Sequence, residues 1–256
     1  MTEDVLADTR DPVNEPLVGF TVGVPAVRRR DRLAILLERA GARVVQVPAV
    51  RPVALTDGAE LRAATRWAPP VDPAPLHRLV DLIENRLVDA VAFTSAPAAS
   101  ALLQAAGPRT GAMLAALRGD VLAVGAATAA APLRRYDVPV VAPPRAHPGA
   151  LVQLLVDELP PRVVHLSARG HRLSLRGHAA LVDGDLRPLA PAPMAVLRSL
   201  ARTPGRVLSR ATLLRALPPG ADEHAVEMAV ARLRAGLRAP GVVQTVVRRG
   251  YRLAVD

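Results

Sequence analysis

Arginine side chains are the main candidates for a chemical role in this chain. All 33 basic residues are Arg, against 23 acidic residues, in a chain of 256. Residues 171–256 hold 14 Arg and 6 acidic residues, so most of the net charge of +10 lies in the C-terminal third. Guanidinium groups bind phosphate oxygens and guanine edges. This charge indicates a polyanionic partner, and a merely solvated basic face is the alternative.

The residue types that are missing exclude several kinds of chemistry. The chain has no Lys, which removes Schiff-base enzymes, P-loop nucleotidases and phosphoreceiver domains. It has no Cys, which removes disulfides, thiolate zinc sites and cysteine nucleophiles. No Gly-x-Ser-x-Gly elbow is present, and the six His residues show no metal-ligand spacing. We therefore expect no metal site and no cofactor.

The sequence carries no signal for a membrane or for export. No apolar run approaches the roughly 18 residues that span a bilayer. The acidic start, Met1 to Asp4, lacks the basic region of a signal peptide. Together with the absence of Cys, this predicts a cytoplasmic protein without a membrane partner.

A helix predicted over about 222–238 positions several of the C-terminal arginines. Four apolar residues fall in a narrow stripe at about 100° per residue and are expected in the core: Val226, Val230, Leu233 and Leu237. The opposite face carries His224, Met228, Ala231 and Ala235, flanked by Arg232 and Arg238. Small residues rimmed by arginines suit close approach to a nucleic-acid groove. An ordinary solvated face is the alternative.

A hairpin is predicted after this helix, from residues 242–247 and 251–253. Arg248 and Arg249 would stand at its tip, where they suit a phosphate backbone or a minor groove. Two further helices are predicted before it, one over 192–202 and a shorter one for which Ser209 is the N-cap.

An earlier hairpin is indicated by Asp183-Gly184, and residues 162–170 are expected to form a linker or a strand. The order of hairpin, three helices and hairpin resembles the winged-helix output domain of response regulators. The segments that carry the resemblance are 189–197, 204–214, 225–237 and 245–253.

The resemblance implies that the third helix enters the major groove of DNA and that the hairpin, or wing, touches the minor groove. It places on the reading face His224, Met228 and Arg232. It places on the DNA backbone Arg206, Arg210, Arg248 and Arg249. Tyr251 is expected to pack in the core of the wing rather than stack on a base.

The N-terminal part alternates strands with helices. Apolar strands are predicted at 17–24, 43–47, 90–94, 121–124 and 138–141, and helices at 32–41, 76–87, 97–106, 126–135 and 148–159. Strands without polar alternation, separated by helices, indicate a parallel sheet buried on both faces. The predicted fold is therefore an α/β doubly wound domain of about five strands over 17–160, followed by a small α+β winged helix-turn-helix domain over 171–256.

Ligands of such sheets usually bind at the carboxyl ends of the strands. Thr94 and Ser95 follow one predicted strand there, and Gly125 and Thr128 follow another. Hydroxyls and free helix N–H groups would suit a carboxylate ligand, and helix capping alone is the alternative. No Gly-x-Gly-x-x-Gly follows the first strand, so dinucleotide binding has no support.

The N-terminal part resembles uroporphyrinogen-III synthase. The matching segments, in order, are 19–22, 36–42, 45–48, 89–98 and 123–129. The resemblance implies two α/β domains joined by a two-strand bridge, with a cleft that cyclises hydroxymethylbilane, a linear tetrapyrrole with eight carboxylates. That reaction uses no metal and no organic cofactor.

The departure from this family is large. The outgoing bridge, 45–53, and the start of a second domain, 57–66, are recognisable, but Trp67 already opens the return connection. Nearly the whole middle domain is therefore missing between Arg66 and Trp67. Thr65-Arg66-Trp67 also stands where the family often carries a tyrosine. With one wall of the cleft gone, binding of a flexible octa-anion loses its preorganisation.

Three hypotheses follow. The first is a bacterial transcriptional regulator that binds double-stranded DNA. Its α/β domain would sense an anionic, tetrapyrrole-like small molecule or mediate homodimerisation, and so change how two winged helices pair on adjacent half-sites. The second is a synthase that still cyclises hydroxymethylbilane. The third is an internally deleted product that does neither.

Overall fold

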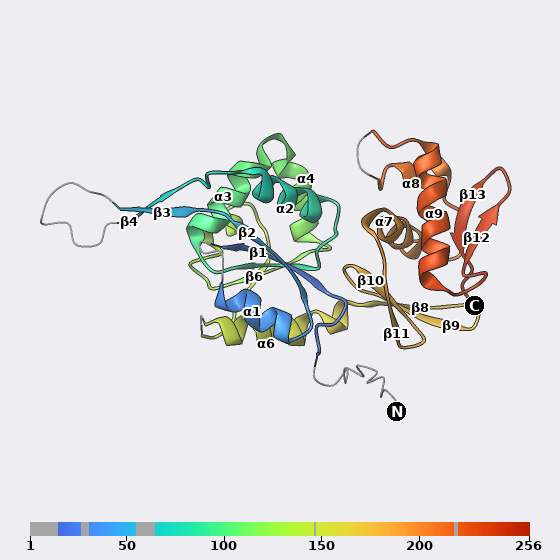
Figure 1. Ribbon diagram of the computed structural model, residues 1–256, viewed down its shortest axis with the longest axis horizontal. Helices are drawn as coiled ribbons and strands as arrows, with labels where there is room; N and C mark the ends of the chain where they lie inside the picture. Colours follow the sequence, from blue (N-terminus) through green and yellow to red (C-terminus); the bar gives the residue numbers. More distant parts are fainter. Residues whose placement is uncertain (1–14, 27–30, 55–64, 146, 218–219) are drawn as a thin grey trace, which may run out of the picture.

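The computed structural model describes residues 15–26, 31–54, 65–145, 147–217 and 220–256. An α/β domain precedes a smaller C-terminal domain of helices and antiparallel strands (Figure 1), which confirms the predicted fold class. The acidic start of the chain and most of the stretch at 57–66 lie outside the described residues.

One parallel sheet of five strands forms the centre of the α/β domain. Its order is β2 (Arg43–Pro48), β1 (Thr21–Ala26), β5 (Ala90–Phe93), β6 (Leu122–Gly125) and β7 (Val140–Val141). All residues of β1, β5 and β6 are buried. Helices cover both faces of these central strands, which is why their sequences are continuously apolar instead of alternating.

Two layers of helices enclose the sheet (Figure 1). One layer holds α1 (Arg32–Arg39) and α6 (Pro148–Glu158), whose leucines share a buried cluster with β1. The other holds α2 (Ala74–Glu84), α3 (Ala96–Ala106), α4 (Thr110–Arg118) and the short α5 (Ala131–Arg134). Short 3-10 turns stand at Gly107–Arg109 and Pro160–Arg162.

This region contains one helix that the sequence patterns do not predict and one that is shorter than predicted. Helix α4 was not predicted, although Met113, Leu114 and Leu117 are buried in the core. The helix expected over 126–135 is reduced to Ala131–Arg134, because residues 127–130 form turns.

The expected two-strand bridge is a ribbon that projects from the α/β domain (Figure 1). Strands β3 (Arg51–Ala54) and β4 (Thr65–Ala68) pair antiparallel, with Pro52 opposite Trp67. Only ten residues, 55–64, separate the two strands, far fewer than an α/β domain requires. The return connection therefore pairs directly with the outgoing one.

The C-terminal domain begins with a four-stranded antiparallel sheet. It consists of β8 (Val164–Ala168), β9 (His171–Leu175), β10 (Ala179–Val182) and β11 (Asp185–Pro188), in the order β11-β10-β9-β8. The segment expected as linker or strand, 162–170, thus supplies β8. Asp183 has a φ of 54° and Gly184 a φ of 98°, as the predicted tight turn between β10 and β11 requires.

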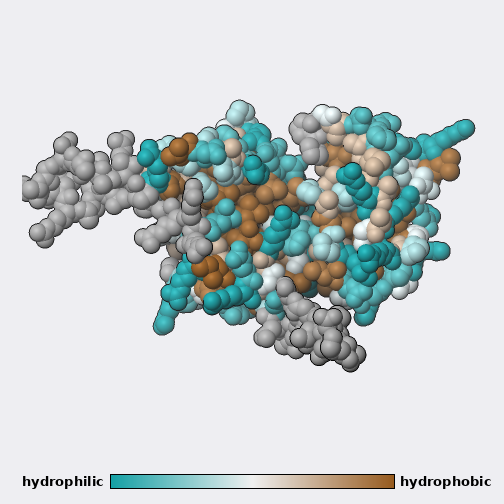
Figure 2. Space-filling model, viewed as in Figure 1, coloured by the Kyte–Doolittle hydropathy of each residue, from teal (hydrophilic) through white to brown (hydrophobic). Residues whose placement is uncertain are grey.

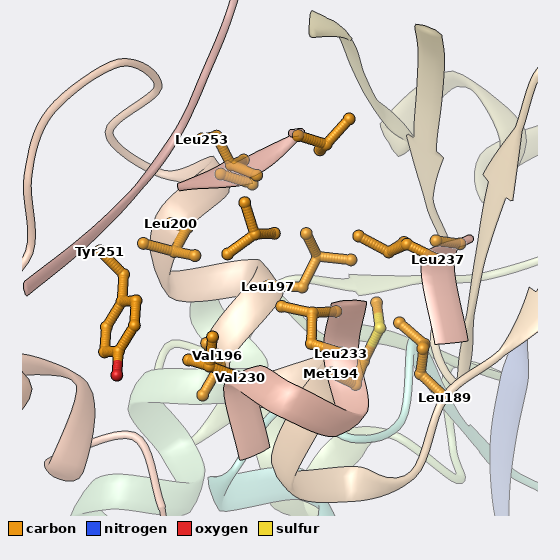
Figure 3. Packing of buried hydrophobic residues seen from close by; sticks show 14 of the residues in the cluster. Leu189, Met194, Val196, Leu197, Leu200, Val230, Leu233, Leu237, Tyr251 and Leu253 are labelled. Atoms are coloured by element: carbon orange, nitrogen blue, oxygen red, sulfur yellow. The ribbon is translucent and has the colours of Figure 1, made fainter. Parts of the chain in front are cut away.

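Three helices and a hairpin complete this domain. They are α7 (Pro191–Ala201), α8 (Arg210–Leu214), α9 (Glu223–Leu237), β12 (Val243–Val246) and β13 (Gly250–Leu253). Leucine and valine side chains of α7 and α9 interlock with Leu253 of the hairpin in a single core (Figure 3). Among the described residues, no helix combines the length and apolarity needed to span a bilayer.

Candidate nucleic-acid interface

Helix α9 lies where the sequence predicted it. Its N-cap is Asp222, whose carboxylate accepts a hydrogen bond of 2.8 Å from the Ala225 N–H, and its C-cap is Arg238, which has a left-handed conformation. The four residues of the predicted apolar stripe are buried: Val226, Val230, Leu233 and Leu237. Because this stripe is buried, only the opposite face of α9 can contact a ligand.

That remaining face is open to solvent. Met228 is 41% exposed, and the other members of the predicted face are exposed as well: His224, Ala231, Arg232, Ala235 and Arg238. Figure 2 shows a weakly hydrophobic column over α9 with hydrophilic side chains on both sides. Such a surface lets the helix approach a groove closely while guanidinium groups remain at its margins.

The wing presents its two arginines at the turn between β12 and β13. Val247, Arg248 and Arg249 are all exposed, and Arg248 has a φ of 60°. The Arg249 N–H donates to the Val246 carbonyl at 2.9 Å, which closes the turn. Both guanidinium groups are therefore carried on a short, hydrogen-bonded tip.

The wing is anchored to the segment before α8. Tyr251 and Leu208 exchange two backbone hydrogen bonds, of 2.8 and 3.0 Å. A Cβ on Gly250 would lie 2.0 Å from the Leu208 carbonyl oxygen, so a side chain there would clash with the backbone. Glycine at this position permits the close approach that holds the wing beside α8.

Helix α8 begins as predicted, with the Ser209 hydroxyl accepting a hydrogen bond of 3.1 Å from the Thr212 N–H. Arg210 at its start is half-buried and pairs with Glu227 of α9 at 3.1 Å. The hydrogen bond to Glu227 raises the pKa of Arg210. Arg206, in the turn before α8, is exposed.

Sequence reasoning missed the role of Arg234. Its side chain leaves α9 and donates to the Val243 carbonyl at 3.0 Å and to the Thr245 hydroxyl at 2.8 Å. Its guanidinium carbon lies 5.9 Å from the ring centre of Tyr251. Tyr251 is 5% exposed, which confirms its predicted place in the core of the wing. Arg234 thus connects the exposed helix to the wing.

The four candidate ligand residues of the α/β domain lie at the carboxyl ends of two adjacent strands, since Phe93 of β5 is paired with Gly125 at the end of β6. Ser95 caps α3 through a hydrogen bond of 3.4 Å from the Ala98 N–H, as predicted, and Thr94 is exposed. Thr128 is exposed but does not cap a helix, since the N-cap of α5 is Ala130. The expectation of two hydroxyl caps is correct only for Ser95.

Three histidines of the C-terminal domain have other partners. His165 lies 2.8 Å from the Ser174 hydroxyl, His171 pairs with Asp183 at 2.7 Å, and His178 lies 2.8 Å from the Thr21 hydroxyl. Among the described residues, no group of three or more His, Cys, Asp and Glu is arranged to hold a metal ion.

Comparison with protein families assigns both halves. The model of uroporphyrinogen-III synthase HemD matches residues 31–177, more than half of the chain. The chain belongs to the uroporphyrinogen-III synthase family. A second model, transcriptional regulatory protein, C terminal, matches residues 185–253. This family member therefore carries the winged-helix DNA-binding domain of transcription regulators behind its synthase-like part.

Solved structures include relatives of each half. The DNA-binding domain of RstA from Klebsiella pneumoniae, in complex with the RstA box, is 26% identical over 35% of this chain and 96% of that one, with a TM-score of 0.29. The DNA-binding domain of E. coli CadC is 26% identical over 31% and 80%, with a TM-score of 0.27.

Uroporphyrinogen-III synthase from the extremely thermophilic bacterium Thermus thermophilus is 24% identical over 56% of this chain, with a TM-score of 0.35. The match covers 51% of that enzyme, so this chain spans about half of its length. No curated protein matches the chain.

Proposed function

We propose that this protein is a transcription regulator that reads double-stranded DNA with α9 and its wing. The observation that carries the proposal is the exposed face of α9, with small residues at its centre and Arg232 at its margin, beside a wing tipped by Arg248 and Arg249. An α-helix fits the major groove, and arginine is the side chain that most often reads guanine there.

The proposed contacts divide into two kinds. His224, Met228 and Arg232 reach base edges in the major groove, where they supply sequence preference. The backbone contacts come from Arg206, Arg210, Arg248 and Arg249, which supply affinity that depends on salt. Arg210 shares its charge with Glu227, so it contributes less of this affinity than the two wing arginines.

The α/β domain is proposed as a sensor of an anionic, tetrapyrrole-like small molecule or as a dimerisation unit. Thr94, Ser95, Gly125 and Thr128 at the carboxyl edge of the sheet are the proposed ligand residues. Synthase activity is not proposed, because the β3–β4 ribbon leaves ten residues where a second wall of the cleft would be needed.

The experiment that tests the proposal is binding of the purified chain to the promoter region of its own gene, in competition with nonspecific DNA. Arg248→Ala/Arg249→Ala is compared with Arg134→Ala/Arg135→Ala, a control that removes the same charge from two positions of the α/β domain. The wild type and the control are expected to retain one fragment that the wing variant loses.

Absence of any sequence preference at low salt would overturn the proposal. A coupled assay with hydroxymethylbilane then tests the synthase alternative directly, since formation of the cyclic product would require a complete site that this proposal denies.

A further inference from the structure

The two domains meet at the amino-terminal edge of the parallel sheet. Thr21 opens β1, Asp89 directly precedes β5, and Asp120 lies just before β6. Facing them are the loop between β9 and β10 and one side of helix α7. This edge is opposite to the carboxyl edge that carries Thr94 and Gly125.

Asp89 is the centre of this contact. Its carboxylate accepts hydrogen bonds from the Thr21 N–H at 2.7 Å and from the Arg198 guanidinium at 3.4 Å. It also accepts one from the Gly177 N–H. The carboxylate is buried, and burial raises the pKa of Asp89 against the opposing effect of Arg198. A buried carboxylate is costly without such partners, and two of the three come from the other domain.

Gly177 is required here by its size. A Cβ on Gly177 would lie 1.8 Å from the Asp89 carboxylate oxygen Oδ2 and 2.9 Å from the Thr21 nitrogen. Gly177 does not have a positive φ, so its backbone conformation does not require glycine. The Gly177 carbonyl in turn accepts a hydrogen bond of 3.4 Å from Arg198. Only a residue without a side chain lets the loop reach the carboxylate.

Further contacts surround Asp89 on the same edge. Arg176 donates to the Val18 carbonyl, and its guanidinium carbon lies 5.0 Å from the centre of the Phe20 ring. The His178 N–H donates to the Gly19 carbonyl at 3.3 Å, and Arg202 pairs with Asp120 at 3.0 Å. The interface between the two domains therefore combines main-chain, charged and aromatic contacts.

We infer that the joint formed by Asp89, Gly177 and Arg198 docks the winged-helix domain on the sheet edge so that the chain unfolds and binds DNA as one cooperative body. Arg198 lies on α7, and Met194 and Leu197 of the same helix pack against α9 (Figure 3). A short path thus leads from Asp89 through α7 to the proposed reading helix.

The same strands connect the joint to the proposed ligand residues. Strand β5 (Ala90–Phe93) lies between Asp89 and Thr94, and β6 begins shortly after Asp120 and ends at Gly125. The reading face of α9 is exposed while the joint is closed, so DNA need not open it. This DNA-dependent part of the inference rests on the proposed function, whereas the cooperative unfolding does not.

The test uses Gly177→Ala in the full chain, with Gly111→Ala as the matched control. A Cβ on Gly111 in α4 meets no atom within 4 Å. Calorimetry is expected to give one unfolding transition for the wild type and the control, and two transitions for Gly177→Ala. Coupled domains unfold together only while their interface is intact. Arg198→Met, which keeps the apolar stem and removes the charge, is expected to separate the transitions as well.

Hydrogen exchange extends the test to DNA. A mixed-sequence duplex at low salt should slow exchange of the β5 amides in the wild type, because stabilisation of one domain is shared by the other. In Gly177→Ala the slowing should be confined to the C-terminal domain. Two transitions in the wild type, or a single transition in Gly177→Ala, would overturn the inference whether or not the duplex binds.

Discussion

Arg234 of the exposed helix donates a hydrogen bond of 2.8 Å to the hydroxyl of Thr245 in the wing. Its guanidinium also bonds to the Val243 carbonyl and lies over the Tyr251 ring. Arg234 thus links helix α9 to the wing, in addition to the hydrophobic core that the two elements share. In the proposed complex these two elements contact neighbouring grooves of the same duplex, so their separation matters for binding.

Arg234→Met is therefore expected to weaken DNA binding although Arg234 is not assigned a DNA contact. The substitution removes two hydrogen bonds, and each typically contributes about 1 kcal/mol to stability. Thermal unfolding should occur at a lower temperature, and Kd for the promoter fragment should rise several-fold. Arg252→Met is the control, because Arg252 bonds to Gln244 within the wing. Equal Kd values for both variants would contradict the prediction.

Replacing Arg232 or Arg248 with Ala is expected to change DNA affinity in two different ways. A base contact discriminates among sequences, so Arg232→Ala should cost about 1–3 kcal/mol on the preferred site and little on mixed sequence. A phosphate contact does not discriminate, so Arg248→Ala should weaken binding to both and reduce the salt slope by about one. Titrations of both duplexes at several salt concentrations measure the two effects, and identical salt slopes for the two variants would refute the division.

Gly250→Ala is expected to destabilise the wing severely. Two effects act there: Gly250 has a φ of 129°, and an added Cβ would lie 2.0 Å from the Leu208 carbonyl oxygen. Gly184→Ala separates them, because Gly184 has a φ of 98° but nothing within 4 Å of its Cβ position. The control should lose about 1–2 kcal/mol from backbone strain alone. Urea unfolding should show a clearly larger loss for Gly250→Ala, and equal losses would mean that the wing tolerates the clash by moving.

Local patterns predicted most of the fold. Helix α9 could be placed because its apolar stripe and its capping aspartate lie within one short segment. Helix α4 is not predicted from the sequence because it follows Gly107-Pro108, a pair that is typical of a loop. The helix predicted before β7 is too long for a different reason: the alanine-rich residues 126–130 have high helical propensity, but no side chain caps a helix there.

The candidate site also contains features that the sequence predicts and contacts that it does not. The exposed face of α9 and the wing arginines follow from periodicity and turn residues. The contact of Arg234 with Thr245 needs the hairpin to fold back on the helix, and the contact of Gly177 with Asp89 needs two domains to dock. No spacing within either segment encodes these distances, so only the three-dimensional arrangement shows them.

The environment of His178 is expected to lower the free energy of unfolding in mild acid. Burial, together with the nearby charge of Arg43, lowers the pKa of His178 below its ordinary value of 6.5. The unfolded chain then binds more protons than the folded one as the pH falls through that value. Stability is therefore retained above the ordinary value and decreases as the pH falls toward the lowered pKa.

Urea unfolding at about pH 7.5 and about pH 5.5 measures this decrease, since that interval contains the ordinary titration range of histidine. His178→Gln removes the titrating ring but keeps a polar side chain facing the Thr21 hydroxyl, so it should reduce the difference between the two conditions. His165→Gln is the control, because His165 is exposed and bonds to Ser174. A pH dependence left intact by His178→Gln would assign the acid sensitivity to another group.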